Sequence, residues 1–325
     1  MMNFRFSLTG FRGFGFPSAT LLAGLVLIAA CGALPSQART LEVGGDKEYK
    51  MPSEAAAKAQ DGDRIAIAPG EYFDCAIWRN KNLTIEGTGP GATAVITDKV
   101  CQGKALFVVQ GANVTIRNLT LQRARVPDMN GAGIRAEGRD MVVDHVRFIN
   151  NQDGILSSSN LGGTLTVLDS EFDRNGVCAP TCAHAIYANQ LDLLRIERSK
   201  FTNTRQGHHI KSRASRTEVL NSTIGDGDEG TASYLIDIPN GGDLVVRGNT
   251  MQKGPMAENH SAAIVIGAEG VSNPTHEITI EGNSFRNTGS HETYFVRNLT
   301  ATEAMLKGNK ISGATKPLQG DGSVR

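Results

Sequence analysis

A short segment near the middle of the chain carries a high density of titratable side chains. The run Gly207-His-His-Ile-Lys-Ser-Arg213 contains two imidazoles, an ammonium and a guanidinium, and Tyr234 and Asp237 follow within the next 24 residues. Crowded titratable groups shift one another's pKa values, which is typical of sites that transfer protons. Cations of this kind also bind anions. The segment therefore predicts a site for acid–base chemistry on an anionic ligand.

A sequence repeat of about 28 residues must position these groups. Short phrases such as Val114-Thr-Ile, Leu165-Thr-Val and Ile278-Thr-Ile alternate apolar and polar residues, which is the period of a β-strand. Seven residues after the first residue of each phrase, from Val114 onward, stands another apolar residue: Leu121, Phe148, Phe172, Phe201, Ile224, Met251, Phe285 and Ile311. A fixed period of this length predicts stacked coils, with the phenylalanine column in the core.

A second strand in each coil places the titratable groups in ladders. These strands align on Ile134, Ile155, Ile186, Ile210, Ile236 and Ile264, and the next residue of each faces outward. Neighbouring members of such a ladder lie about 5 Å apart. The predicted catalytic residues are Lys211, His208, His209, Tyr234 and Asp237. The predicted substrate-binding residues are Arg213, Tyr187, His184, Asp153, Arg135 and Asn189. An exposed polar strand face is the alternative interpretation.

The distribution of charge narrows the class of ligand. The whole chain has 33 basic and 33 acidic residues, so its net charge indicates no partner. Between Arg195 and Arg216, however, seven Lys or Arg accompany one acid, Glu197. A local excess of this kind favours a polyanion, unless it is only a solvated face. An exported protein rarely meets nucleic acid, and these residues offer no aromatic stacking platform, so we expect an acidic polysaccharide and no nucleic acid.

Residues 1–38 resemble an export signal. Arg5 and Arg12 precede an apolar run, Ala19 to Ala30, that is too short to span a bilayer, and Ser36-Gln-Ala38 forms a cleavage site. In the alternative, Ile28-Ala-Ala-Cys31 is a lipobox and Cys31 carries a lipid anchor. Either reading predicts an exported monomer, periplasmic or secreted or an outer-membrane lipoprotein, without a transmembrane segment in the mature chain.

The other four cysteines predict two disulfides. Cys75 and Cys101 are 26 residues apart, close to one repeat, so stacking would bring them within reach of each other. Cys178 and Cys182 bracket a short loop that a local bridge can close. Zinc bound by Cys178, Cys182 and His184 is the alternative, although zinc sites usually have four ligands. An oxidising compartment favours the disulfides.

The ends of the repeat series set the domain limits. Leu41 to Tyr49 predicts a first strand, and Ser53 is a good N-cap for a helix over Glu54 to Gln60 that would cover the open end of the stack. We expect one domain over residues 39–315 and a polar tail over 316–325.

The chain resembles the right-handed parallel β-helix proteins of the pectate-lyase-like superfamily. The resemblance covers about 270 residues and depends on the repeat period, on the Ala-rich helix with Asp61-Gly-Asp63 and Pro69-Gly-Glu-Tyr72, and on Asn-bearing corners such as Glu281-Gly-Asn-Ser-Phe285. It implies an all-β, single-domain solenoid with a short N-terminal capping helix. It also implies a carbohydrate substrate, because most enzymes on this fold act on polysaccharides.

A lyase or an epimerase acting on a uronate is the reaction that suits these residue types. Arg213 would neutralise the carboxylate, Lys211 or His208 would remove the neighbouring proton, and Tyr234 or His209 would act as the acid. A glycoside hydrolase is disfavoured, because Asp153 and Asp237 are expected about 14 Å apart. The first alternative to a lyase or an epimerase is a non-catalytic protein that binds glycans or supports an envelope assembly, and a glycoside hydrolase is the third interpretation. The acidic loop Asp226-Gly-Asp-Glu229 offers oxygen ligands for Ca²⁺ as a cofactor, and a plain turn is the alternative interpretation.

Overall fold

The structure is a computed structural model that describes residues 10, 38–179 and 181–325. The predicted export signal and the lipobox at Cys31 lie outside the described residues. Within these residues no helix is long and apolar enough to cross a membrane. Residues 38–325 form one compact unit.

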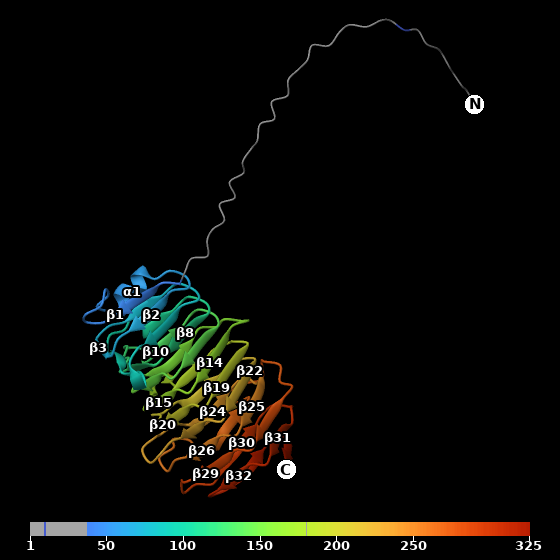
Figure 1. Ribbon diagram of the computed structural model, residues 1–325. Helices are drawn as coiled ribbons and strands as arrows, with labels where there is room; N and C mark the ends of the chain where they lie inside the picture. The colour runs from blue at the N-terminus through green and yellow to red at the C-terminus, as the bar shows by residue number, and fades with distance from the viewer. Residues whose placement is uncertain (1–9, 11–37, 180) are drawn as a thin grey trace. The chain divides into compact units, whose positions relative to one another are not determined.

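Three parallel sheets form the walls of a β-helix, and Figure 1 shows their strands stacked in chain order. Sheet 1 contains β1 (Thr40–Val43), β2 (Arg64–Ile67), β5 (Thr84–Gly87), β8 (Val114–Arg117), β11 (Met141–Asp144), β14 (Thr164–Leu168), β19 (Leu193–Glu197), β22 (Arg216–Leu220), β25 (Asp243–Arg247), β28 (Ile278–Glu281), β31 (Ala304–Lys307) and β34 (Gly322–Val324). Sheet 2 contains β4 (Ala76–Trp78), β7 (Ala105–Val109), β10 (Ala132–Ala136), β13 (Asp153–Ser157), β18 (Ile186–Ala188), β21 (His208–Ser212), β24 (Tyr234–Ile238), β27 (Ala262–Ile266), β30 (Thr293–Asn298) and β33 (Thr315–Gln319). Sheet 3 contains β3 (Gly70–Tyr72), β6 (Ala94–Thr97), β9 (Leu119–Gln122), β12 (Arg147–Ile149), β15 (Glu171–Asp173), β20 (Lys200–Thr202), β23 (Thr223–Gly225), β26 (Thr250–Lys253), β29 (Ser284–Asn287) and β32 (Lys310–Ser312). The predicted parallel β-helix is confirmed.

The register of the sheets follows the sequence repeat. Leu165 pairs with Met141 on one side and Leu194 on the other. Phe172 pairs with Phe148 and Phe201, and the three buried rings stack with centroids 4.6 and 4.5 Å apart. The phenylalanine column is therefore core, as predicted, because one inward-facing residue per strand fills the space between the sheets.

Polar ladders line one corner of the coil. The amide of Asn249 donates to Asn283 at 3.0 Å, and Asn283 donates in turn to Asn309 at 2.9 Å. Ser170, Ser199 and Ser222 take the same position in earlier coils, and each accepts a hydrogen bond from a backbone N–H. These bonds satisfy backbone groups that the turning chain would otherwise leave unpaired in the interior.

The two ends differ from the prediction in detail. Helix α1 spans Pro52–Lys58, and its N-cap is Met51 rather than Ser53. The reason is Pro52, whose fixed φ favours the first helical position. Residues 316–325 do not form a polar tail, because β33 and β34 pair with β30 and β31 and continue the coil. In the described residues, a 3-10 turn, η1 (Pro90–Ala92), also lies outside the three parallel sheets.

Both predicted disulfides are present. Cys75 joins Cys101 and Cys178 joins Cys182. The second bridge closes an antiparallel hairpin, β16 (Val177–Cys178) and β17 (Cys182–Ala183), which lies between β15 and β18 along the chain. Because both sulfurs are consumed, the alternative zinc site of Cys178, Cys182 and His184 is wrong.

Candidate functional site

Three neighbouring strands of sheet 2 bring the central groups together. Lys211 on β21 pairs with Tyr187 on β18 and with Asp237 on β24. The residues just before them in each strand, Ile186, Ile210 and Ile236, are fully buried. The alternation of the strands therefore turns the side chains of Tyr187, Lys211 and Asp237 to the outer face, in the order that the sequence predicts.

Lys211 is held between two carboxylates. Its Nζ lies 3.3 Å from Oδ2 of Asp237 and 2.7 Å from Oε1 of Glu269. The same Asp237 oxygen lies 3.3 Å from Nε2 of His208. Lys211 is only 9% exposed and Asp237 only 3%, so these are largely desolvated charges. Two carboxylates compensate the ammonium that burial would otherwise disfavour.

Glu269 connects Lys211 to Arg213. Its Oε2 accepts a hydrogen bond of 2.6 Å from Nη2 of Arg213, whose Nε donates to Oη of Tyr187 at 2.9 Å and whose Nη1 bonds Asn240. Glu269 lies in the loop after β27, between Gly267 and Gly270, which both have positive φ. Sequence reasoning missed Glu269, since its loop has no place in the repeat.

A ladder of side chains bonds to backbone groups one coil further on. Oδ1 of Asp153 accepts from the N–H of His184 at 2.7 Å, Nδ1 of His184 accepts from the N–H of His208 at 2.9 Å, and Nδ1 of His208 accepts from the N–H of Tyr234 at 3.2 Å. Each imidazole therefore carries its proton on Nε2 when it is neutral. The ring of His208 stacks between those of His184 and Tyr234, with centroids 4.8 and 5.2 Å away.

Burial sets the protonation state of this ladder. The pKa of His208 is lowered to about 3, chiefly by desolvation and next by the charge of Lys211. Desolvation also lowers the pKa of His184 well below its usual value. It raises the pKa of Asp237 to about 6 and the pKa of Asp153 to about 8. At neutral pH the two histidines are neutral and Asp153 is protonated, whereas Asp237 is mostly ionised.

A pocket of about 440 Å³ opens beside the cluster. His184, Tyr187, His208 and Lys211 line it, together with Thr181 and Cys182 of the β16–β17 hairpin and Asn130. The insert over residues 253–261 contacts the cluster as well, because Oη of Tyr234 lies 3.5 Å from Oγ of Ser261. Asn130 and the hairpin residues therefore border the pocket beside the cluster, as expected of a binding cleft.

His209 does not belong to the outer face, contrary to the prediction. Its side chain is fully buried, with Nδ1 2.8 Å from Oγ1 of Thr204 and Nε2 2.8 Å from Oδ1 of Asp226. The register pairs His208 with Tyr234 and Ile210 with Ile236, and the ladder breaks at the intervening residue. This break turns His209 inward together with Ile210, so strict alternation gives the wrong face.

Three other predicted residues lie away from the contacts around Lys211. Asp153 is fully buried, and three strand intervals separate β13 from β24, which places it about 14 Å from Asp237. Asn189 bonds backward to Ser157, with its amide donating to the carbonyl oxygen at 2.7 Å. Arg135 is on β10, two strands before Tyr187.

The basic stretch between Arg195 and Arg216 is largely neutralised. Arg195 pairs with Glu197 and Glu218, Arg198 with Asp169 and Glu197, and Arg216 with Glu218, Asp243 and Glu277. Most of these acids come from neighbouring coils. The excess of positive charge in the linear sequence is therefore not an excess on the surface, and it does not indicate a polyanionic ligand.

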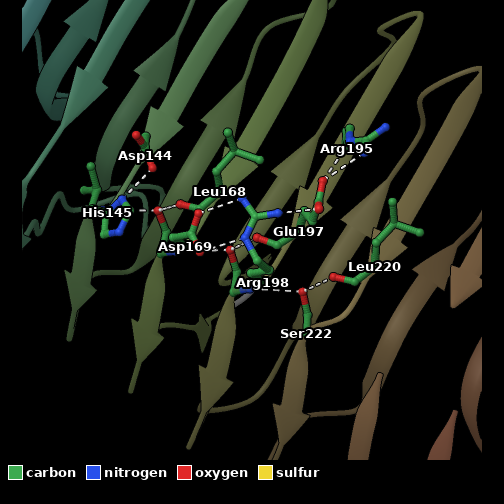
Figure 2. Close-up of polar contacts among 12 residues, drawn as sticks. Asp144, His145, Leu168, Asp169, Arg195, Glu197, Arg198, Leu220 and Ser222 are labelled. Atoms are coloured by element: carbon green, nitrogen blue, oxygen red, sulfur yellow. Dashed lines mark hydrogen bonds and ion pairs between the residues drawn. The ribbon is translucent and has the colours of Figure 1, made fainter. Parts of the chain in front are cut away.

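The acidic loop at 226–229 does not fit Ca²⁺. Both oxygens of Asp226 are already bound, Oδ1 by His209 and Oδ2 by the N–H of Gly254 at 2.8 Å. A different group of metal-type ligands, Asp144, His145 and Asp169, lies on the surface near sheet 1 (Figure 2). There Arg198 binds both oxygens of Asp169, at 2.9 and 2.8 Å, so the group forms an ion-pair network.

Comparison with known proteins gives a likeness of fold. No protein-family model matches the chain, and no curated protein matches it significantly. Among solved structures, an alginate lyase from Paenibacillus sp. str. FPU-7 is 17% identical with a TM-score of 0.48, covering 87% of this chain and 99% of that one. A pectin methylesterase from Aspergillus niger is 10% identical with a TM-score of 0.47, covering 89% and 92%. The PL6 family alginate lyase AlyGC is 14% identical with a TM-score of 0.48, covering 90% of this chain and 40% of its own.

Proposed function

We propose that the cluster around Lys211 binds an acidic polysaccharide and removes the proton beside a uronate carboxylate, as a lyase or an epimerase does. The observation that carries this proposal is the carboxylate of Glu269, which Lys211 and Arg213 hold between them at 2.7 and 2.6 Å. That carboxylate is 45% exposed and comes from a glycine-flanked loop. It occupies the position that a sugar carboxylate would take on displacing it.

Arg213 is the group suited to hold the substrate carboxylate. Tyr187 and Asn240 fix the orientation of its guanidinium through two of its nitrogens, and the third faces Glu269. A guanidinium fixed in this way presents a ready donor to an incoming carboxylate. Neutralising that carboxylate makes the neighbouring carbon acid easier to deprotonate.

Lys211 is better suited than His208 to remove the proton. His208 is a weak base, since its pKa is about 3 and its Nδ1 faces the N–H of Tyr234. Lys211 lines the pocket and its Nζ contacts Glu269, so a sugar carboxylate that displaces Glu269 brings the neighbouring carbon within reach of this amine. Tyr234 takes the role of the acid, because His209 is buried.

Elimination and epimerisation share this first step, and their products differ. The test is incubation of the protein with a panel of uronate polysaccharides, with ultraviolet absorbance to detect the unsaturated product and deuterium uptake at the acidic carbon to detect epimerisation. We expect one of the two signals on at least one polymer. Neither signal on any polymer, alongside measurable binding, would assign the protein to the non-catalytic class that binds glycans. One observation favours that class: the ammonium and guanidinium are already satisfied by Glu269.

Glu269 gives a sharper test of the anion position. Glu269→Gln removes the internal carboxylate, so the affinity for a uronate oligosaccharide should rise by roughly tenfold, measured by titration calorimetry. Glu277→Gln is the matched control, because Glu277 is 42% exposed and pairs with Arg216 outside the cluster. Equal affinities in the two variants would remove Glu269 as a stand-in for the substrate.

We further propose that the protein acts outside the cytoplasm. The two disulfides support this, because such bonds persist in oxidising compartments. The export signal predicted over residues 1–38 points the same way.

A further inference from the structure

A second and larger pocket lies outside the cluster, at the corners where sheet 3 leads into sheet 2. Its volume is about 680 Å³. Arg125, which follows β9, and Arg205, which follows β20, line it together with Met129, Val177, Gln206 and Glu229. None of the roles assigned above uses this pocket.

The two arginines share one acceptor. Nη2 of Arg125 donates to Oδ1 of Asn150 at 2.7 Å, and Nη1 of Arg205 donates to the same oxygen at 3.2 Å. Among residues 38–179 and 181–325, neither has a carboxylate within 4.0 Å. Desolvation, followed by the charge of Arg205, lowers the pKa of Arg125. Two like charges thus converge on a neutral oxygen, where an anion would relieve their repulsion.

Other arginines on the coil are paired with carboxylates instead of a neutral oxygen. Arg123 is held by Glu71 and Asp98, and Arg198 by Asp169 and Glu197. The acid that lines the pocket, Glu229, is exposed and lies within ion-pair distance of neither arginine. The pocket therefore keeps a net positive lining.

Two segments contribute residues both to this pocket and to the pocket beside Lys211: the loop after β9, and the β16–β17 hairpin with the residue before it. Met129 lines the first and Asn130 the second. Gly176, which precedes the β16–β17 hairpin, and Val177 line the first pocket, and Thr181 and Cys182 of the hairpin line the second. A chain molecule that crosses the hairpin would therefore meet both pockets.

We propose that the Arg125–Arg205 pocket is a second anion-binding site, which holds the carboxylate of another sugar residue of the acidic polysaccharide. This inference rests on the proposed function. A polyuronate carries a carboxylate on every sugar, and a guanidinium pair binds such a group through parallel hydrogen bonds. The site would contribute to the affinity for oligosaccharides long enough to span the hairpin.

The test is calorimetric titration with uronate oligosaccharides of increasing length, and with a neutral oligosaccharide of the same lengths. Arg125→Gln/Arg205→Gln should lower the affinity for the longest uronates about tenfold and reduce its dependence on salt, leaving the shortest ones unaffected. Arg79→Gln is the matched control for Arg205→Gln alone, because each removes one positive charge and Arg79 is exposed and lies outside both pockets. Thermal unfolding checks each variant, and Arg205→Gln alone removes the one side-chain hydrogen bond that Arg205 makes within the described part of the chain.

The outcomes separate the two proposals. Unchanged affinity in the double variant overturns the second site, whatever the turnover. Absence of turnover on every polymer, with a loss of affinity in the double variant alone, upholds the site and overturns the proposed reaction. A loss that is equal for the neutral oligosaccharide, or equal in Arg79→Gln, also overturns the site, since neither charge nor position would then matter.

Discussion

At the scale of single residues, the geometry assigns different tasks to groups that the sequence could not separate. His184 and His208 each use Nδ1 to accept a backbone N–H, so they are neutral hydrogen-bond donors through Nε2. Lys211 retains contacts with two carboxylates, and one of these, Glu269, is half exposed. The group that a ligand can most readily displace is therefore Glu269.

Tyr234→Phe tests the acid role. The change removes only the hydroxyl, and we expect kcat on a uronate polymer to fall by roughly 10²-fold with little change in KM. Tyr294→Phe is the matched control. Tyr294 aligns with Ala262, which follows Tyr234 in the ladder, and its ring faces Lys316 instead of the cluster. Similar kcat values for both variants would remove Tyr234 from the mechanism.

Asp153 predicts a dependence of stability on pH. Its pKa is about 8 in the folded protein and about 3.9 in the unfolded chain. The folded state therefore binds the extra proton between these values, and the free energy of unfolding should decrease as pH rises through that window. The decrease between pH 5 and 8 is on the order of 3 kcal/mol.

Asp153→Asn should abolish this contribution, because the amide is neutral at every pH. Urea unfolding at pH 5, 6.5 and 8 measures it. Asp46→Asn is the control, since the Asp46 side chain is 84% exposed. The same pH slope in Asp153→Asn as in the parent protein would show that Asp153 is ionised in the fold.

At the scale of elements, sheet 2 carries the site because its strands break their alternation at one position. His209, Leu235 and Ala263 are buried together with the isoleucines that follow them. The residues before the break, His184, His208 and Tyr234, then face the same side as Tyr187 and Lys211, as their ring contacts show. The irregularity thus gathers two rows of side chains on one face.

The stacked rings of sheet 3 predict a large energetic effect. Phe172→Ala removes a fully buried ring between two others and should lower the free energy of unfolding by about 3–5 kcal/mol. Phe73→Ala is the control, because Phe73 is 65% exposed, and we expect a change within about 0.5 kcal/mol. Chemical denaturation measures both. A small loss for Phe172→Ala would mean that the column does not stabilise the coil.

The repeat made most of this architecture predictable. One inward residue per strand fixes the register, so the pairing of Lys211 with Tyr187 and Asp237 follows from aligning Ile186, Ile210 and Ile236. The inward position of His209 was not predicted from its polar residue type, because the carboxylate of Asp226 that satisfies its imidazole comes from the next coil. Glu269 could not be predicted as a site residue either, because a loop residue outside the repeat has no register that would place it beside Lys211.

At the scale of the whole molecule, ion pairs between coils balance the charge. The chain has equal numbers of acidic and basic residues, and acids from adjacent coils neutralise most of the Arg195–Arg216 stretch. Linear sequence windows cannot show this, because stacking places residues about one repeat apart side by side. Arg125 and Arg205 are exceptions, because no acid in the described part of the chain forms an ion pair with either of them.

The central claim is that Lys211, set between Tyr187 and Asp237, removes a proton from a uronate. Its most direct test is the turnover of Lys211→Met on a responsive uronate polymer, compared with Lys200→Met. Lys200 is exposed, belongs to the same basic stretch and lies on sheet 3. We predict that kcat falls by at least about 10³-fold in Lys211→Met and stays at the parent value in Lys200→Met. Full turnover by folded Lys211→Met would contradict it.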